Sequence, residues 1–91
     1  MKFNSKTVEI GGDKYTIKEI SAKERKQIFV IVRGDDPTDA EAHAIKMGCA
    51  QFADKTIDEI YEMPGTIFAI LAKEVMTISG LGDDSETEKN S

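Results

Sequence analysis

The chain has 91 residues, of which 40% are hydrophobic and 32% charged, which fits one small globular domain better than a disordered chain. Its net charge of -5 disfavours nucleic acid as a partner, because an acidic protein repels phosphates. The apolar runs at 28–32 and 67–72 are far shorter than the roughly 20 residues that span a bilayer. With a single cysteine and no signal-peptide core, the sequence predicts a cytoplasmic protein without membrane association.

Residues 7–18 have the pattern of a β-hairpin. Polar and apolar residues alternate on both sides of Gly11-Gly12-Asp13. Period-two alternation around a glycine-rich turn is typical of paired antiparallel strands. A two-stranded hairpin is marginally stable in water, so one of its faces must pack on the rest of the chain. The residues expected on that face are Val8, Ile10, Tyr15 and Ile17.

A helix is predicted over residues 22–33, ending before Gly34. Ser21 and Glu24 have the spacing of a capping box, in which each side chain accepts the other residue's backbone N–H. The second half of this segment, 28–32, is rich in β-branched residues and also suits a buried strand. The cap and the polar residues that precede the apolar run favour the helix.

The next helix is predicted over residues 37–52. Asp36 can cap it with Pro37 in the first turn, and Thr38 offers a start one register later. Glycine inside a helix costs roughly 1 kcal/mol, so Gly48 is expected to serve close packing. The apolar stripe of this helix consists of Ala44, Ile45, Gly48, Cys49 and Phe52.

Two more helices are predicted at 57–62 and 65–79, the first opened by Thr56 and the second by Pro64. Residues 82–91 are acidic and polar without an apolar side chain, which predicts a disordered tail. The expected fold class is therefore α+β and mostly helical. A single domain over residues 1–81 would hold an N-terminal two-stranded β-hairpin followed by about four α-helices.

The residues carry no catalytic or metal-binding pattern, so we expect neither enzymatic activity nor a cofactor. His43 is the only histidine, and it lies six residues before Cys49 on a different helix face, which makes a poor metal-ligand pair. His43 is expected at the surface. Cys49 belongs to an apolar stripe and is expected to be a buried core residue rather than a reactive thiol.

Surplus apolar surface is the main functional signal. The runs at 28–32 and 67–72 point in every direction around a helix, whereas an amphipathic helix needs an apolar stripe only. A chain of this size buries about 60–65% of its unfolded surface, so part of these runs should stay exposed and bind a partner. The alternative, that both runs are simply core, remains open. The candidate partner-binding residues are Phe29, Ile31, Phe68, Ile70 and Met76.

Three segments resemble the tail assembly chaperones of long-tailed bacteriophages. The first is the hairpin that leads into Ile20-Ser21-Ala22-Lys23-Glu24-Arg25, and the second is the short acidic helix ending at Met63-Pro64. The third is the last helix, which ends Ile78-Ser79-Gly80-Leu81 before an acidic tail. Family members often have a longer Asp/Gly-rich insertion where this chain has the compact segment 48–56.

The resemblance implies a non-enzymatic chaperone that binds the helical tape measure protein, keeps it soluble and helps to recruit tail tube protein. It also implies a location in the host cytoplasm, absence from the mature virion, and self-association. Two alternatives stay open. One is a small structural or connector protein of a virion. The other is a nucleic-acid or ribosome-associated module that would use Lys18, Lys23, Arg25 and Lys26.

Overall fold

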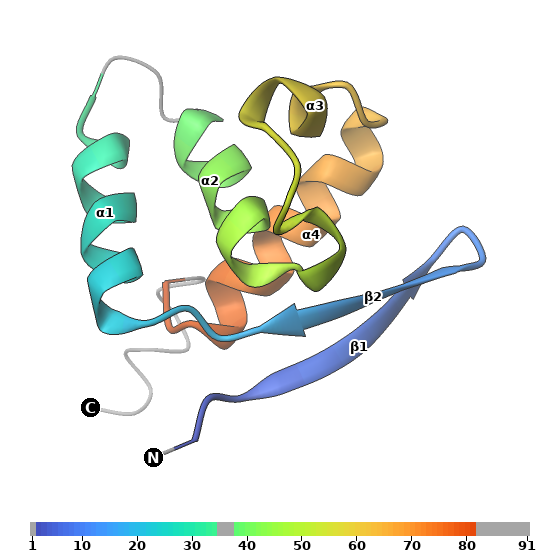
Figure 1. Cartoon of the computed structure of the whole chain (residues 1–91), viewed down its shortest axis with the longest axis horizontal. Helices are drawn as coiled ribbons and strands as arrows, with labels where there is room; N and C mark the ends of the chain where they lie inside the picture. Colours follow the sequence, from blue (N-terminus) through green and yellow to red (C-terminus); the bar gives the residue numbers. More distant parts are fainter. Residues whose placement is uncertain (1, 35–37, 82–91) are drawn as a thin grey trace.

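The computed structural model describes residues 2–34 and 38–81, which form an antiparallel hairpin followed by four α-helices (Figure 1). This confirms the predicted α+β, mostly helical fold. The predicted cap at Asp36-Pro37 and the predicted disordered tail at 82–91 lie outside the described residues. The elements are β1 (Ser5–Ile10), β2 (Asp13–Lys18), α1 (Ala22–Val32), α2 (Thr38–Gly48), the short 3-10 helix η1 (Ala50–Phe52), α3 (Ile57–Tyr61) and α4 (Gly65–Ile78).

The hairpin turns at Gly11 and Gly12, which both have positive φ angles of 60° and 91°. Two positive φ angles are what a type I′ turn requires, and glycine adopts them without steric cost. Val8 pairs with Tyr15 across the strands, so the predicted alternation sets the observed register. The inner face packs on α4 and η1, where Ile17 is fully buried and the ring of Tyr15 stacks on Phe52.

The prediction that one helix would run over 37–52 is wrong, because α2 ends at Gly48. Cys49 has extended backbone angles and forms an isolated antiparallel bridge with Ile17 of β2. The chain then turns through η1, where the Gln51 side chain accepts the backbone N–H of Thr16 at 3.0 Å. Pairing with the hairpin therefore overrides the local helical preference of this segment.

Helix α2 is central to the core and packs on α1, α3 and α4. Its small residues allow the neighbouring helices to approach closely. At Gly48 an added Cβ would lie 2.4 Å from Val75 Cγ1 of α4 and 3.1 Å from the carbonyl oxygen of Lys18, which confirms the predicted packing role. The α2 residues that are buried are Ala40, Ala42, Ala44, Ile45 and Gly48.

Capping boxes are present at the start of α1, where Ser21 and Glu24 predict one, and at the start of α3, where Thr56 is the predicted helix start. At the start of α1 the Ser21 Oγ accepts the backbone N–H of Glu24 at 3.1 Å, and Glu24 Oε1 accepts the N–H of Ser21 at 2.8 Å. The same pair of bonds joins Thr56 and Glu59 at the start of α3, at 3.1 and 2.8 Å. Each box satisfies two backbone donors that a helix N-terminus leaves without an intrahelical partner.

The α3 box makes stability depend on pH. The backbone N–H of Thr56 donates to the Glu59 carboxylate and lowers the pKa of that group below its usual value. A lowered pKa in the folded state means that the box stabilises the fold above the ordinary glutamate pKa and is lost as pH falls through the folded value. We expect the urea midpoint of the wild type to lose more than that of Glu59→Gln between pH 7 and pH ~3. Equal losses would contradict this role.

Candidate interaction surface

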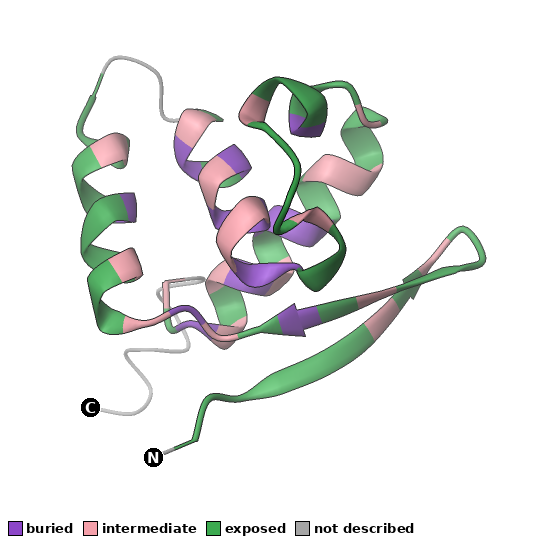
Figure 2. Ribbon diagram, viewed as in Figure 1, coloured by how far each residue is buried: buried purple, intermediate pink, exposed green. Residues whose placement is uncertain are grey.

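Helix α1 lies at one edge of the molecule and is the least buried of the longer helices (Figures 1 and 2). It packs on α2, and Ile28 is its one buried residue among those described. Its entry is firmly held, since Ile20 is buried and its backbone N–H donates to Ser79 Oγ at 3.1 Å. Fixed at its start and covered on one side, α1 presents most of its circumference outward.

Three large apolar side chains of α1 are exposed. Val30 is 62% exposed, Val32 45% and Phe29 43%, whereas Ile28 beside them is 1% exposed. The expected surplus of apolar surface is therefore confirmed for the run at 28–32. The interpretation of both runs as simply core is wrong for this one, because a helix that packs on a single neighbour buries only one stripe.

Basic side chains surround this apolar surface. Arg25, Lys26 and Arg33 are exposed on the same helix as Phe29 and Val30, at positions that adjoin them on successive turns. The guanidinium carbon of Arg25 lies 5.4 Å from the centroid of the Phe29 ring, a cation–π geometry that holds the charge beside the aromatic face. We call these five residues the α1 face.

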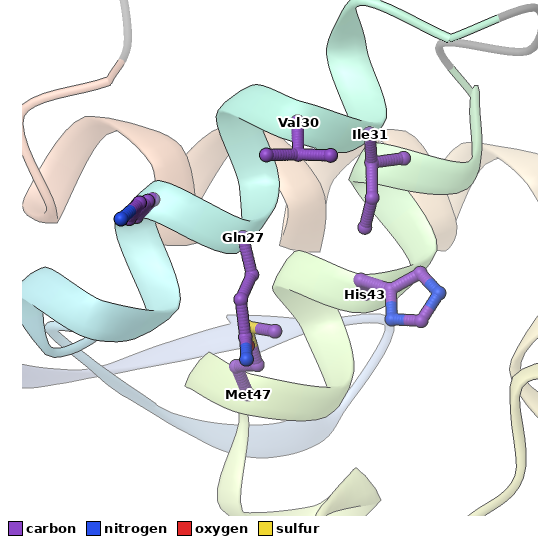
Figure 3. Close-up of a pocket in the computed structure, with 6 residues that line it drawn as sticks. Gln27, Val30, Ile31, His43 and Met47 are labelled. Carbon is purple, nitrogen blue, oxygen red and sulfur yellow. The ribbon is translucent and has the colours of Figure 1, made fainter.

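An open groove of about 490 Å3 runs between α1 and α2. Figure 3 shows Gln27 and Ile31 on α1 and His43 and Met47 on α2. Val30 of α1 also lines the groove (Figure 3). A second hollow of about 390 Å3 lies on the other side of the same helix. The residues that line this outer hollow are Ala22, Arg25, Lys26, Phe29, Val30 and Arg33.

The structure divides the five predicted partner-binding residues between two helices. Phe29 is on the α1 face and half-buried Ile31 lines the groove. On α4, Ile70 is 36% exposed, whereas Phe68 is half-buried and stacks on the Tyr61 ring of α3 at a centroid distance of 5.7 Å. Met76 is half-buried against the core. None of these three α4 residues lines either hollow of α1.

Sequence reasoning missed Val30, the most exposed of these apolar residues, and it missed the groove. The Ser21–Glu24 capping box contains the information needed to identify Val30 as exposed. Once Glu24 is fixed at the start of α1, residues four and seven positions later, Ile28 and Ile31, fall on the same side of the helix. Val30 must then point elsewhere. The α2 side of the groove, His43 and Met47, had no comparable sequence signal, although His43 was expected near the surface.

The described residues include a single cysteine, Cys49. They contain no group of three or more histidine, cysteine or carboxylate side chains that could hold a metal ion. Cys49 is fully buried, as expected, and desolvation raises the pKa of its thiol, which suppresses the reactive thiolate. Among the helices of residues 2–34 and 38–81, none has the length and apolar character to cross a membrane.

Comparison of the chain with protein-family models, with curated proteins and with solved structures found no significant match.

Proposed function

We propose that this protein is a tail assembly chaperone of a long-tailed bacteriophage, a non-enzymatic protein that binds the helical tape measure protein and keeps it soluble. The observation that carries the proposal is the α1 face, where Phe29 and Val30 are exposed beside a groove that reaches to α2. Exposed apolar patches on small proteins mark binding sites, and a groove beside a helix suits another helix. The resemblance of three sequence segments to this family supplies the identity of the partner.

The same proposal places the protein in the cytoplasm of the infected host, where it coats the tape measure protein, recruits tail tube protein and leaves before the virion is complete. A small structural or connector protein of the virion would use the same apolar surface permanently. Purified particles distinguish the two, because the chaperone is absent from them and a connector is present.

Co-expression with the tape measure protein of the same phage tests the function. We expect wild type to keep most of the tape measure protein in the supernatant, and Val30→Glu to leave most of it in the pellet. Val30 is exposed and glutamate is a good helix former, so the variant should fold as well as wild type. Burying a carboxylate in an apolar contact is unfavourable, which should weaken binding at least about tenfold.

The matched control is Ala69→Glu, which adds the same charge at an exposed position of α4. It should solubilise the tape measure protein as wild type does. The function is wrong if wild type leaves the tape measure protein insoluble. The α1 face is the wrong surface if Val30→Glu and Ala69→Glu behave alike.

A further inference from the structure

The two hollows that flank α1 are basic in an otherwise acidic protein. The chain has a net charge of -5, yet none of the described residues that line either hollow is acidic. The cations among them are Lys26, Arg25 and Arg33. The one carboxylate of α1, Glu24, is held in the capping box with Ser21, at the start of the helix. A partner that covers this surface therefore meets apolar groups edged by positive charge.

This charge pattern argues against a second copy of α1 as the occupant. Two α1 faces brought together would bury Phe29 and Val30 well, but they would also oppose three cations with three cations. Like charges held close together at an interface are unfavourable and exclude partners. A complementary occupant carries carboxylates instead.

The shape of the surface selects a helix. Lys26 and Val30 line both hollows and are four residues apart, so they form a ridge between two grooves. Eleven residues of α1 give a surface about 16 Å long, which accommodates roughly three turns of a second helix. On the partner helix, an apolar stripe with spacings of three and four residues would lie along this ridge. The residues that flank the stripe would then lie opposite the basic side chains of α1. The guanidinium of Arg25 rests on the Phe29 ring and keeps its in-plane N–H donors for carboxylates.

We propose that the α1 face and the α1–α2 groove bind an acidic amphipathic helix, with apolar side chains astride Val30 and carboxylates on Arg25, Lys26 and Arg33. The inference rests on the proposed function in one respect, since it specifies which segments of a tape measure protein the chain would hold. The groove itself can be tested without that protein.

The test uses the full chain and two fluorescent helical peptides of about 20 residues. Both have leucine at spacings of three and four and alanine elsewhere, and the leucines are flanked by glutamate in one peptide and by lysine in the other. We expect the glutamate peptide to bind at least about tenfold more tightly, with the difference shrinking as salt rises from about 0.05 to about 0.5 M. Amide shifts in NMR spectra should cluster at residues 22–33 and 43–47.

Two variants sharpen the result. The double variant Arg25→Glu, Lys26→Glu should reverse the preference between the peptides, because it changes exposed charges and leaves Phe29 and Val30 in place. The double variant Lys55→Glu, Lys73→Glu is the matched control, since it makes the same change of net charge at exposed positions outside both hollows, and it should leave the preference unchanged. Equal affinity for the two peptides, no binding of either, or shifts centred on α4 would each overturn the proposal.

Other occupants give distinct outcomes. If the chain's own acidic residues filled the groove, neutralising Asp83, Asp84, Glu86 and Glu88 to their amides would tighten peptide binding at least about tenfold, and the proposal would fail. A dimer that the glutamate peptide dissociates would assign the groove to a second copy and overturn the proposal as well.

Co-expression separates this inference from the proposed function. If the variant Arg25→Glu, Lys26→Glu still solubilises the tape measure protein, the function stands and the proposed binding of an acidic helix does not.

Discussion

Replacing Gly48 with alanine is expected to destabilise the fold by about 1–3 kcal/mol, although alanine is the better helix former by roughly 1 kcal/mol. The reason is the crossing of α2 and α4. An added Cβ would lie 2.4 and 2.9 Å from the two γ-methyl carbons of Val75, whose side chain is fully buried and cannot swing away. The carbonyl oxygen of Lys18, at 3.1 Å, closes the other side. Urea denaturation of the wild type and the variant measures the difference.

Two further variants show whether the cause is contact with Val75. Gly65→Ala, at the first turn of α4, meets no atom within 4 Å and should be neutral or slightly stabilising. Val75→Ala alone should cost stability by opening a cavity, but it removes both clashing methyl groups. The double variant Gly48→Ala, Val75→Ala should therefore be more stable than the sum of the single effects predicts, by about 1 kcal/mol or more. If the changes in unfolding free energy of the two single variants simply add in the double variant, the strain does not arise from contact with Val75.

The sequence predicted best where local chemistry decides the structure. The Ser21–Glu24 and Thr56–Glu59 boxes fix the start of two helices through bonds between residues three apart, so their short range makes them visible in the chain. The hairpin register follows in the same way from alternation around Gly11 and Gly12. These elements were located to within a residue or two.

Long-range contacts decided what sequence reasoning missed. Nothing near Cys49 indicates that its backbone will bridge to Ile17, some thirty residues earlier, and that contact ends α2. The groove depends on which helix packs on α1, and that helix is α2. The sequence indicates that the chain has more apolar side chains than it can bury. Which of them stay exposed depends on the helix that packs on α1, and the sequence does not identify that helix. For that reason Phe29 was predicted and its more exposed neighbour Val30 was not.

The neighbours Ile28 and Phe29 should respond very differently to alanine substitution. Ile28 is the fully buried anchor of α1 against α2, so its loss should cost about 2–4 kcal/mol, as large-to-small changes in a core do. Phe29 is 43% exposed and touches Arg25 at the surface, so Phe29→Ala should cost less than about 1 kcal/mol. Urea denaturation compares the two variants directly.

Amide hydrogen exchange shows which helices are destabilised in Ile28→Ala. Because α1 packs on α2 and its capping box holds only its first turn, loss of the Ile28 contact should let α1 open while α2 and α4 stay together. Amides of Ala22–Val32 should then exchange at least about 30-fold faster, and those at the centre of α4 should change much less. Opening of α1 also removes the groove, so Ile28→Ala should weaken partner binding through the fraction of molecules with α1 open, whereas Phe29→Ala should weaken binding from an intact helix. Similar costs for the two variants would mean that α1 is not oriented as the exposure of Phe29, Val30 and Val32 requires.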